Sequence, residues 1–507
     1  MAHADYLGVV KRHVEQVLEH AGDRYREEPT PLLADSINLE TGEPPKMQPV
    51  YGDEQVVSSN LSHQQNLLRA MVLLSRLSGD KAYADRAKKM YQYHFENLLL
   101  PTGLLKWGGH RYIDLLTLDD NGEKGKVHEL KNDFPYYDLM FEADREKAET
   151  FIKAFWNAHI YSWENFEMGR HGQENGKSLD DIWERPFREI EPFEPRMGLS
   201  FMNTGNDLMF SAMNLYKQTG DNGAVKWGTR MFDIYAMCRN KETKLGAYQF
   251  SQAMKRAETD DFTQTFSEFG DRALRQLGPE LGEHALEANV ILKHQAESIY
   301  ALNPQIVAYY FVNGAPEGAR MLETVAENLR AFAKYAYIEE TNMLRPLLAD
   351  GQDLTGFVPA RPGYYGDGSR FVQFEAGGRF LLSYIKIALL AKDDALWQTA
   401  RKIAKGLGLG ELGNIDGSDA ALNLDTTCAD GAAAMALLAA YEKLGGEYLC
   451  CAKVIADNLV KYHTKEGYFI KMPVADVFSI NSQDPLIVLA VEAAAQGKQE
   501  LIPFAIY

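Results

Sequence analysis

The sequence is poor in cysteine, with four among 507 residues: Cys238, Cys428, Cys450 and Cys451. No two of them have the spacing of a structural zinc site or of a redox-active dithiol, and two are direct neighbours. We therefore expect reduced, buried cysteines, as in a cytoplasmic protein.

Long hydrophobic runs are also missing. No stretch of 18 or more apolar residues occurs, which predicts that no segment spans a membrane. The first residues lead straight into an amphipathic pattern from Tyr6 to Leu18, without the basic start and apolar stretch of a secretory signal. These absences predict a cytoplasmic location, with the periplasm as the alternative if an export signal has been removed.

Positive charge is in deficit, because 53 Lys and Arg residues face 71 Asp and Glu residues and the formal net charge is −18. A field of this sign repels polyanions, so nucleic acid and anionic membranes are excluded as general partners. The remaining composition, 46% hydrophobic and 24% charged, is typical of globular proteins.

Pairs of helices dominate the pattern. An apolar helix from Leu67 to Leu77, a break at Ser78-Gly79-Asp80 and an amphipathic helix over 82–97 form the first pair. Similar breaks occur at Gly220, Gly314, Asp393 and Gly445. Their uneven spacing favours a closed α/α toroid, a barrel of helical hairpins, over a solenoid of fixed period. We predict a mainly α protein with one catalytic domain over 1–507.

Three segments are irregular and rich in Gly, Pro, aromatic and charged residues, at about 99–131, 172–198 and 354–378. The first alternates as a short strand or hairpin would, and the other two are predicted to be long loops. Long irregular segments in a compact domain are commonly functional. We expect these small β and loop insertions to wall a cleft at one rim of the toroid.

Three polar motifs carry the chemistry. Lys-Trp-Gly-Gly-His-Arg-Tyr occupies 106–112, Val-His-Glu-Leu-Lys occupies 127–131, and Met-Gly-Arg-His-Gly occupies 168–172. Among their side chains, two histidines and a carboxylate could form an open transition-metal site, with a guanidinium beside it. Each side chain alone is more often an ordinary polar residue. The adjacent glycines favour the metal site, because glycine permits sharp turns and close approach of a ligand.

These motifs resemble those of polysaccharide lyase family two, the pectate lyases built on an α/α barrel. The resemblance covers nearly the whole chain, since length, helical layout and motif order all agree. It implies that His110, Glu129 and His171 hold a divalent transition metal, Mn with Co or Ni as alternatives, and that Arg170 is the Brønsted base. It also implies that polygalacturonate or oligogalacturonides are cleaved by β-elimination to 4,5-unsaturated products.

The chemistry of this reaction agrees with such a site. The C5 proton of a uronic acid becomes acidic when a metal neutralises the adjacent carboxylate. Mixed nitrogen and oxygen ligands suit Mn, Co, Ni or Zn better than Ca. By chemistry alone Arg170 is a carboxylate clamp, because arginine keeps its charge in proteins. Only the resemblance makes it the base, and Tyr112 and Lys131 are the fallback bases.

A polyanionic substrate requires a basic cleft in this acidic protein. The candidate basic residues are Lys106, Arg111, Lys126, Lys131 and Arg170. We expect the substrate to be bound by Lys106, Trp107, Arg111, Tyr112 and Lys131. Four of the six tryptophans, Trp107, Trp156, Trp163 and Trp183, lie in or near this region, which suits either a groove for sugar rings or ordinary core packing.

Two other classes of function stay open. A toroidal glycoside hydrolase acting on unsaturated uronides would need two carboxylates across the bond, and Asp138, Asp207 and Asp484 are available. A metal-free sugar-binding or epimerase-like toroid would leave Glu129 and both histidines as ordinary polar residues.

Overall fold

The computed structural model describes residues 4–48, 55–109, 111–122, 128–173, 176–254, 271–277, 281, 286–470 and 476–507. The chain forms two compact units. The first comprises Met1–Ala158, His171–Leu179 and Leu422–Tyr507, and the second comprises His159–Arg170 and Asp180–Ala421. The single catalytic domain stays a prediction.

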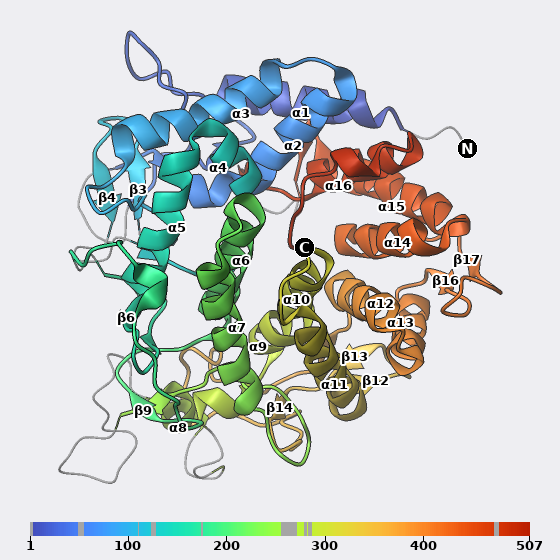
Figure 1. Cartoon of the computed structure of the whole chain (residues 1–507). Coiled ribbons are helices and arrows are strands. Elements are labelled where there is room, and N and C mark those ends of the chain that lie inside the picture. The colour runs from blue at the N-terminus through green and yellow to red at the C-terminus, as the bar shows by residue number, and fades with distance from the viewer. Residues whose placement is uncertain are drawn as a thin grey trace. The chain divides into compact units, whose positions relative to one another are not determined.

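The first unit joins helices from both ends of the sequence (Figure 1). Helix α2 packs against α3 and α16, α14 packs against α15, and α1 contacts both α2 and α16. Its helices are α1 (Tyr6–His20), η1 (Leu61–Gln64), α2 (Gln65–Ser78), α3 (Ala82–Tyr93), η2 (His94–Leu98), α4 (Tyr137–Ala143), α5 (Arg145–His159), α14 (Gly431–Leu444), α15 (Glu447–His463), α16 (Asp484–Ala495) and η7 (Gln499–Leu501).

The first unit also contains short antiparallel strands. Their pairs are β1–β20, β18–β19 and β5–β8, and β2, β3 and β4 form one three-stranded sheet. The strands are β1 (Ser36–Asn38), β2 (Ser58–Ser59), β3 (Arg111–Asp114), β4 (Asp120–Gly122), β5 (His128–Glu129), β8 (His171–Gly172), β18 (Thr464–Lys465), β19 (Tyr468–Phe469) and β20 (Val477–Ser479). The hairpin β3–β4 and strand β5 lie in the irregular segment 99–131.

The second unit contains three helical hairpins, α6–α7, α10–α11 and α12–α13, and α10 also packs on α6 and α12. Its helices are η3 (Ile182–Glu184), α6 (Met202–Thr219), α7 (Asn222–Met237), α8 (Arg272–Leu277), η5 (Glu287–Asn289), α9 (Lys293–Ala296), η6 (Glu297–Leu302), α10 (Asn303–Val312), α11 (Gly318–Ala336), α12 (Gly378–Ala391) and α13 (Asp394–Gly406).

The strands of this unit are equally short, and β9–β10 is a parallel pair. They are β6 (Ile160–Ser162), β7 (Glu167–Met168), β9 (Pro195–Arg196), β10 (Gln252–Ala253), β11 (Val290–Ile291), β12 (Tyr337–Ile338), β13 (Met343–Leu344), β14 (Leu347–Leu348), β15 (Phe374–Glu375) and β16 (Gly410–Glu411), with β17 (Ala421–Leu422) at the boundary of the unit. Strand β15 is the regular element between Leu354 and the start of α12.

All five predicted hairpins are present, and left-handed residues separate their helices. Gly79 and Gly220 follow α2 and α6 with φ of 78° and 79°, so each ends its helix at no steric cost. After α12 the same position is held by Lys392, with φ of 54°. The predicted fold class is confirmed, a mainly α protein of α/α hairpins of the toroid type with small β insertions.

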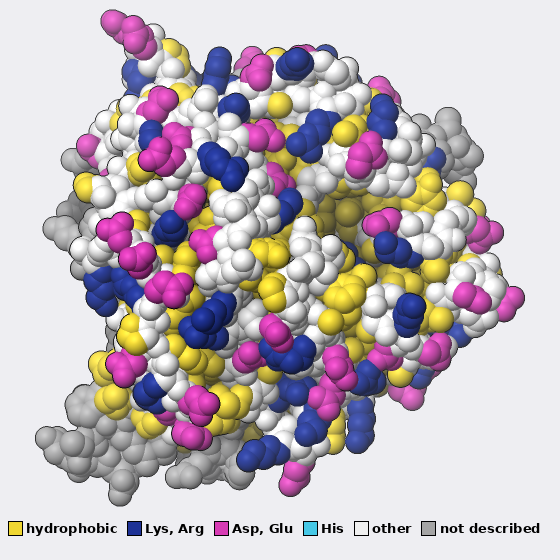
Figure 2. All heavy atoms as spheres, in the orientation of Figure 1, with side chains coloured by type: hydrophobic (Ala, Val, Ile, Leu, Met, Phe, Trp, Pro, Cys, Tyr) yellow, Lys and Arg dark blue, Asp and Glu magenta, His cyan; other side chains and the backbone are white. Residues whose placement is uncertain are grey.

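Acidic and basic side chains are interspersed over the face drawn in Figure 2. In the described part of the chain, no helix combines the length and the apolarity needed to cross a membrane. All four cysteines are free, and Cys238 and Cys451 are buried as expected, whereas Cys450 is exposed.

Candidate functional site

The second and third motifs meet in a small antiparallel sheet of the first unit. Strand β5 pairs with β8, so that Glu129 lies opposite His171. Glu129 Oε1 is 3.4 Å from His171 Nε2, and the two residues are 1% and 8% exposed. Strand pairing thus brings a buried carboxylate and a buried imidazole together.

The separation of these two atoms fits a shared divalent cation. Metal–ligand bonds of about 2.1 Å at a tetrahedral angle separate two ligand atoms by about 3.4 Å. The third predicted ligand, His110, lies outside the described residues. Within those residues, no three His, Cys, Asp or Glu side chains gather as a metal site would require. Glu129 and His171 therefore fit the predicted site, and the place of His110 stays a prediction.

The glycine pair of the first motif packs against Glu129. The Gly109 N–H donates to Glu129 Oε2 at 3.1 Å, and Lys131 Nζ is 2.9 Å from Glu129 Oε1. Gly108 has φ of 92°, and a Cβ there would lie 2.2 Å from the Glu129 carbonyl oxygen. These glycines therefore let their own segment approach the backbone of Glu129, a predicted metal ligand, at short distance.

A second carboxylate, which the sequence reasoning missed, lies near Glu129. Burial raises the pKa of Asp133 to about 6; the charge of His63 opposes this, and the charge of Glu129 adds to it. Asp133 is four residues beyond Glu129 in a segment without regular structure. The sequence gives no signal for this residue, because the distance between Asp133 and Glu129 depends on how the chain turns after β5.

Two of the predicted basic residues share one acidic partner. Lys106 Nζ lies 2.6 Å from Asp120 Oδ2, and Arg111 pairs with Oδ1 of the same carboxylate. Lys126 lies outside the described residues. The side chain of Lys131 is 42% exposed, so it is the best placed of these cations to meet a ligand from solvent.

Tyr112 lies on β3 beside these residues. Its hydroxyl is buried and has no hydrogen-bond partner in the described part of the chain. Burial raises the pKa of Tyr112, which favours the protonated phenol and argues against a role as a base.

The tryptophans do not form a groove. Trp107, Trp156, Trp163 and Trp183 are 0%, 0%, 4% and 7% exposed. The Trp107 ring stacks on His128 with centroids 6.2 Å apart, and its indole has no face open to a sugar. The expectation that Trp107 contacts the substrate is therefore corrected, since core packing accounts for all four side chains.

Arg170 precedes His171 in the chain and belongs to the second unit. It follows the strand pair β6–β7. The Gly169 N–H donates to the His159 carbonyl at 3.2 Å, and His159 Nδ1 lies 2.8 Å from the Gly169 carbonyl oxygen. The backbone just before Arg170 is thus fixed from both sides.

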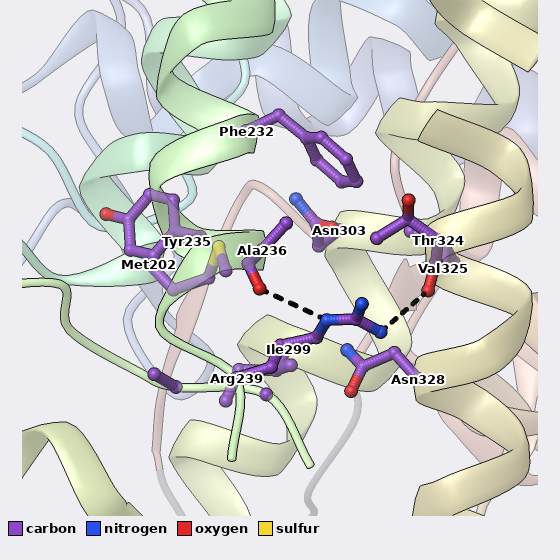
Figure 3. Close-up of a pocket in the computed structure, with 12 residues that line it drawn as sticks. Met202, Phe232, Tyr235, Ala236, Arg239, Ile299, Asn303, Thr324, Val325 and Asn328 are labelled. Atoms are coloured by element: carbon purple, nitrogen blue, oxygen red, sulfur yellow. Dashed lines mark hydrogen bonds between the residues drawn. The ribbon is translucent and has the colours of Figure 1, made fainter. Parts of the chain in front are cut away.

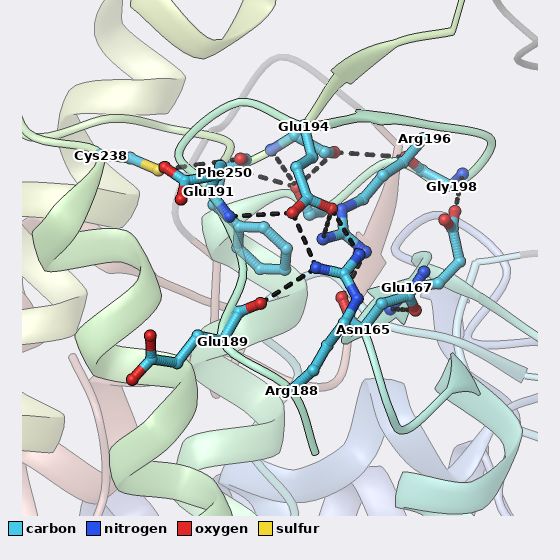
Figure 4. A network of polar contacts seen from close by, with 12 residues as sticks. Asn165, Glu167, Arg188, Glu189, Glu191, Glu194, Arg196, Gly198, Cys238 and Phe250 are labelled. Carbon is cyan, nitrogen blue, oxygen red and sulfur yellow. Dashed lines mark hydrogen bonds and ion pairs between the residues drawn. The ribbon is translucent and has the colours of Figure 1, made fainter. Parts of the chain in front are cut away.

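A polar network supports this strand pair (Figure 4). Glu194 accepts two hydrogen bonds from Arg188, at 3.0 and 2.9 Å, and one from Arg196 Nη2 at 3.0 Å. Arg196 also donates to the carbonyl of Asn165, in the turn between β6 and β7. The hydrogen bond from Arg188 lowers the pKa of Glu194 to about 2, so this carboxylate stays charged at neutral pH.

A narrow cavity in the second unit lies elsewhere, among α7, α10 and α11 (Figure 3). Arg239 lines it and donates to the carbonyls of Ala236 at 3.2 Å and Thr324 at 3.5 Å. None of its lining residues is a predicted site residue.

Comparison with known proteins identifies the family. Residues 30–507 match the family model described as periplasmic pectate lyase. The chain belongs to this family. It is 32% identical over 513 residues to the pectate disaccharide-lyase of Dickeya dadantii (strain 3937), covering 98% of this chain and 90% of that protein. The predicted family is confirmed, and the chain is a polysaccharide lyase of the pectate lyase type.

Solved structures show weaker likeness. The GH76 α-mannanase of Bacteroides thetaiotaomicron aligns with a TM-score of 0.44 at 8% identity over 98% of this chain and 97% of its own. Cellobiose 2-epimerase from Bacillus thermoamylovorans aligns with a TM-score of 0.44 at 11% identity over 96% of this chain and 99% of its own.

Membership in this pectate lyase family corrects the predicted location. The cytoplasmic expectation is wrong, because the family is described as periplasmic. That expectation relied on the lack of a signal pattern at the start of the sequence and on the cysteine spacing.

The family match also sets the hydrolase and epimerase alternatives aside. Of the carboxylates considered for a hydrolase, Asp207 is fully buried in α6, and Asp484, in the first turn of α16, lies 2.8 Å from His463 Nδ1. The contact with His463 gives Asp484 a structural role.

Proposed function

We propose that this lyase cleaves α-1,4-linked galacturonate in polygalacturonate or oligogalacturonides by metal-dependent β-elimination. His110, Glu129 and His171 hold the divalent cation, which is Mn, with Co or Ni as alternatives. The pairing of Glu129 with His171 across β5 and β8 is the observation that supports this proposal best. A buried oxygen and nitrogen at 3.4 Å are a donor set that a transition metal prefers.

The reaction divides into one proton removal and one bond cleavage. Arg170, in its neutral form, takes the C5 proton at a guanidinium nitrogen. The electron pair of the C5–H bond forms the C4–C5 double bond, and the C4–O4 pair leaves with O4, which takes a proton from water. The bound cation supplies Lewis-acid stabilisation of the charge that develops on the substrate carboxylate.

The remaining predicted residues, apart from Trp107, bind the substrate in this proposal. Lys131 pairs with a galacturonate carboxylate, because its side chain is 42% exposed beside Glu129. Lys106 and Arg111 contact the substrate only if their ion pairs with Asp120 break. Tyr112 contributes a buried hydroxyl donor near β3, and Trp107 fixes the backbone because its carbonyl accepts from the Glu129 N–H at 2.9 Å.

The test measures absorbance of the 4,5-unsaturated product from trigalacturonate. Chelated enzyme is compared with enzyme after Mn, Co or Ca has been restored, and bound metal is quantified separately. We expect product with Mn or Co and little with Ca. Glu129→Ala and His171→Ala should lose both metal and activity, and Arg170→Ala should lose activity alone.

The matched control is His20→Ala, which removes a half-buried histidine of α1 that hydrogen-bonds to Tyr468. It should keep both metal and activity. Full activity of chelated wild-type enzyme, or normal metal content in folded Glu129→Ala and His171→Ala proteins, would contradict the proposed metal site.

A further inference from the structure

Tyr364 is an exposed aromatic side chain among buried neighbours in the second unit. It lies in the irregular segment that precedes α12, and it is 37% exposed. Tyr365 and Arg272, which both contact it, are 5% and 7% exposed. A single exposed aromatic residue needs no functional explanation. Tyr364 differs from such a residue in the side chains that hold it and in its position relative to Arg170.

The Tyr364 ring is held rigidly. The Arg272 guanidinium carbon lies 3.8 Å from the ring centroid, and Arg272 pairs with the buried carboxylate of Glu287. Tyr365 packs edge-on against the ring, with centroids 5.1 Å apart and planes at 86°. A side chain fixed in this way loses little conformational entropy when a ligand binds to it.

Tyr248 also interacts with Tyr364, and its hydroxyl lies 3.1 Å from His294 Nε2. Tyr248 therefore joins Arg272 and Tyr365 among the side chains that surround Tyr364.

Tyr364 also lies within electrostatic reach of Arg170. Burial raises the pKa of Tyr364, and the positive charges of Arg272 and Arg170 oppose that rise. Both residues belong to the second unit, so the second unit alone brings an exposed aromatic ring near the proposed base.

We propose that Tyr364 is a platform on which one galacturonate ring of the substrate stacks beside Arg170. The C–H faces of a sugar ring pack against an aromatic face, and the Arg272 cation covers the other face of Tyr364. The proposal rests on the proposed function, because it assigns a sugar subsite to that same reaction.

The test compares Tyr364→Ala, Tyr364→Phe and Tyr364→Trp in the full chain with trigalacturonate. We expect Tyr364→Ala to raise KM about tenfold, with a smaller change in kcat, because the lost contact serves binding more than chemistry. Tyr364→Phe and Tyr364→Trp should stay within about threefold of wild type, since both keep an aromatic face. Thermal unfolding reports whether each variant is folded.

The control is Tyr462→Ala, since Tyr462 is 49% exposed and also lies against a cation, Lys461. Its KM should not change. Calorimetric titration of chelated enzyme with trigalacturonate adds a readout without turnover, in which Tyr364→Ala should again weaken binding about tenfold.

Two results would overturn the platform. Folded Tyr364→Ala could bind trigalacturonate as tightly as wild type, or Tyr364→Phe could lose as much as Tyr364→Ala, which would assign the role to the hydroxyl. Absence of unsaturated product from wild-type enzyme would instead count against the proposed function, and the titration would still decide whether Tyr364 binds the sugar.

Discussion

Arg196 connects the strand pair that leads to Arg170 with the loop before α6, and Arg196→Met tests that connection. The residue is 2% exposed and donates to the Asn165 carbonyl and to Glu194. Methionine keeps a similar length and removes every donor. The turn between β6 and β7 then loses a hydrogen bond, and the charge of Glu194 loses one of its two partners.

The structure gives the size of this effect. Removing one partner of a buried ion pair costs about 3–5 kcal/mol of unfolding free energy. We expect about 3 kcal/mol for Arg196→Met, since Glu194 keeps its bonds to Arg188 at 3.0 and 2.9 Å. Arg188→Met is the matched control: the Arg188 side chain is 46% exposed, so its loss should destabilise the protein much less than Arg196→Met does.

Urea unfolding and product absorbance measure the two consequences separately. If the network positions Arg170, Arg196→Met should lower kcat roughly 10- to 100-fold and leave KM nearly unchanged, because a small displacement of a reacting group is costly. Arg196→Lys should recover part of the rate. Equal stability of Arg196→Met and Arg188→Met would refute the buried pair, and lost stability with unchanged kcat would refute the positioning role.

Three further predictions concern single residues. Gly108→Ala should abolish metal binding, because its Cβ would lie 2.2 Å from the Glu129 carbonyl oxygen. Gly79→Ala is the control and should keep metal binding, because Gly79 also has positive φ but has open space around it. The measurement is the amount of bound metal. Lys392→Gly should raise the free energy of unfolding by about 1 kcal/mol, because Lys392 has φ of 54°, and Lys392→Ala should not. Burial raises the pKa of Asp271 to about 6, so its contribution to stability is present below about pH 4 and is lost as the pH rises through 6. Relative to Asp271→Asn, wild type should lose at most about 3 kcal/mol over that range in denaturant titrations, and no pH dependence of the difference would contradict the shift.

The helices could be predicted from the sequence because local signals define them. Each hairpin combines apolar periodicity with a residue that ends the first helix, and Gly79 and Gly220 end theirs in the left-handed conformation that glycine favours. Lys392 ends α12 in the same conformation without a favourable side chain. The sequence signal for this break was the neighbouring Asp393, whose carboxylate caps α13 by accepting a hydrogen bond from the Leu396 N–H at 3.1 Å.

The site could be predicted only in part. Residue types and glycine neighbours indicated Glu129 and His171, but strands of two residues have no periodicity that would reveal how they pair. The pairing of Lys106 and Arg111 with Asp120 depends on the turn between β3 and β4. The burial of Trp107 could likewise not be predicted from the sequence. A tryptophan beside two glycines looks the same in a sequence whether it packs in the core or binds a sugar.

Lys131 connects the proposed metal site with the proposed binding of an anionic substrate. Its ammonium lies 2.9 Å from Glu129 Oε1, the same oxygen that faces His171 Nε2 at 3.4 Å. An oxygen that ligates a cation is a poor partner for an ammonium, because the two positive charges repel each other at this distance. Loading the site should therefore release Lys131, whose side chain is already 42% exposed, for a galacturonate carboxylate.

Lys131→Met should accordingly have opposite effects on the two ligands. Mn should bind about tenfold more tightly, because a competing positive charge is gone, while KM for trigalacturonate rises. Lys147→Met, which removes a lysine paired with Asp144 at 3.7 Å on α5, should change neither. If Lys131→Met weakens Mn binding, Lys131 supports the site instead of competing for it. An acidic protein would then have to attract its polyanionic substrate through Arg170 and the bound cation, since Lys106 and Arg111 are already paired with Asp120.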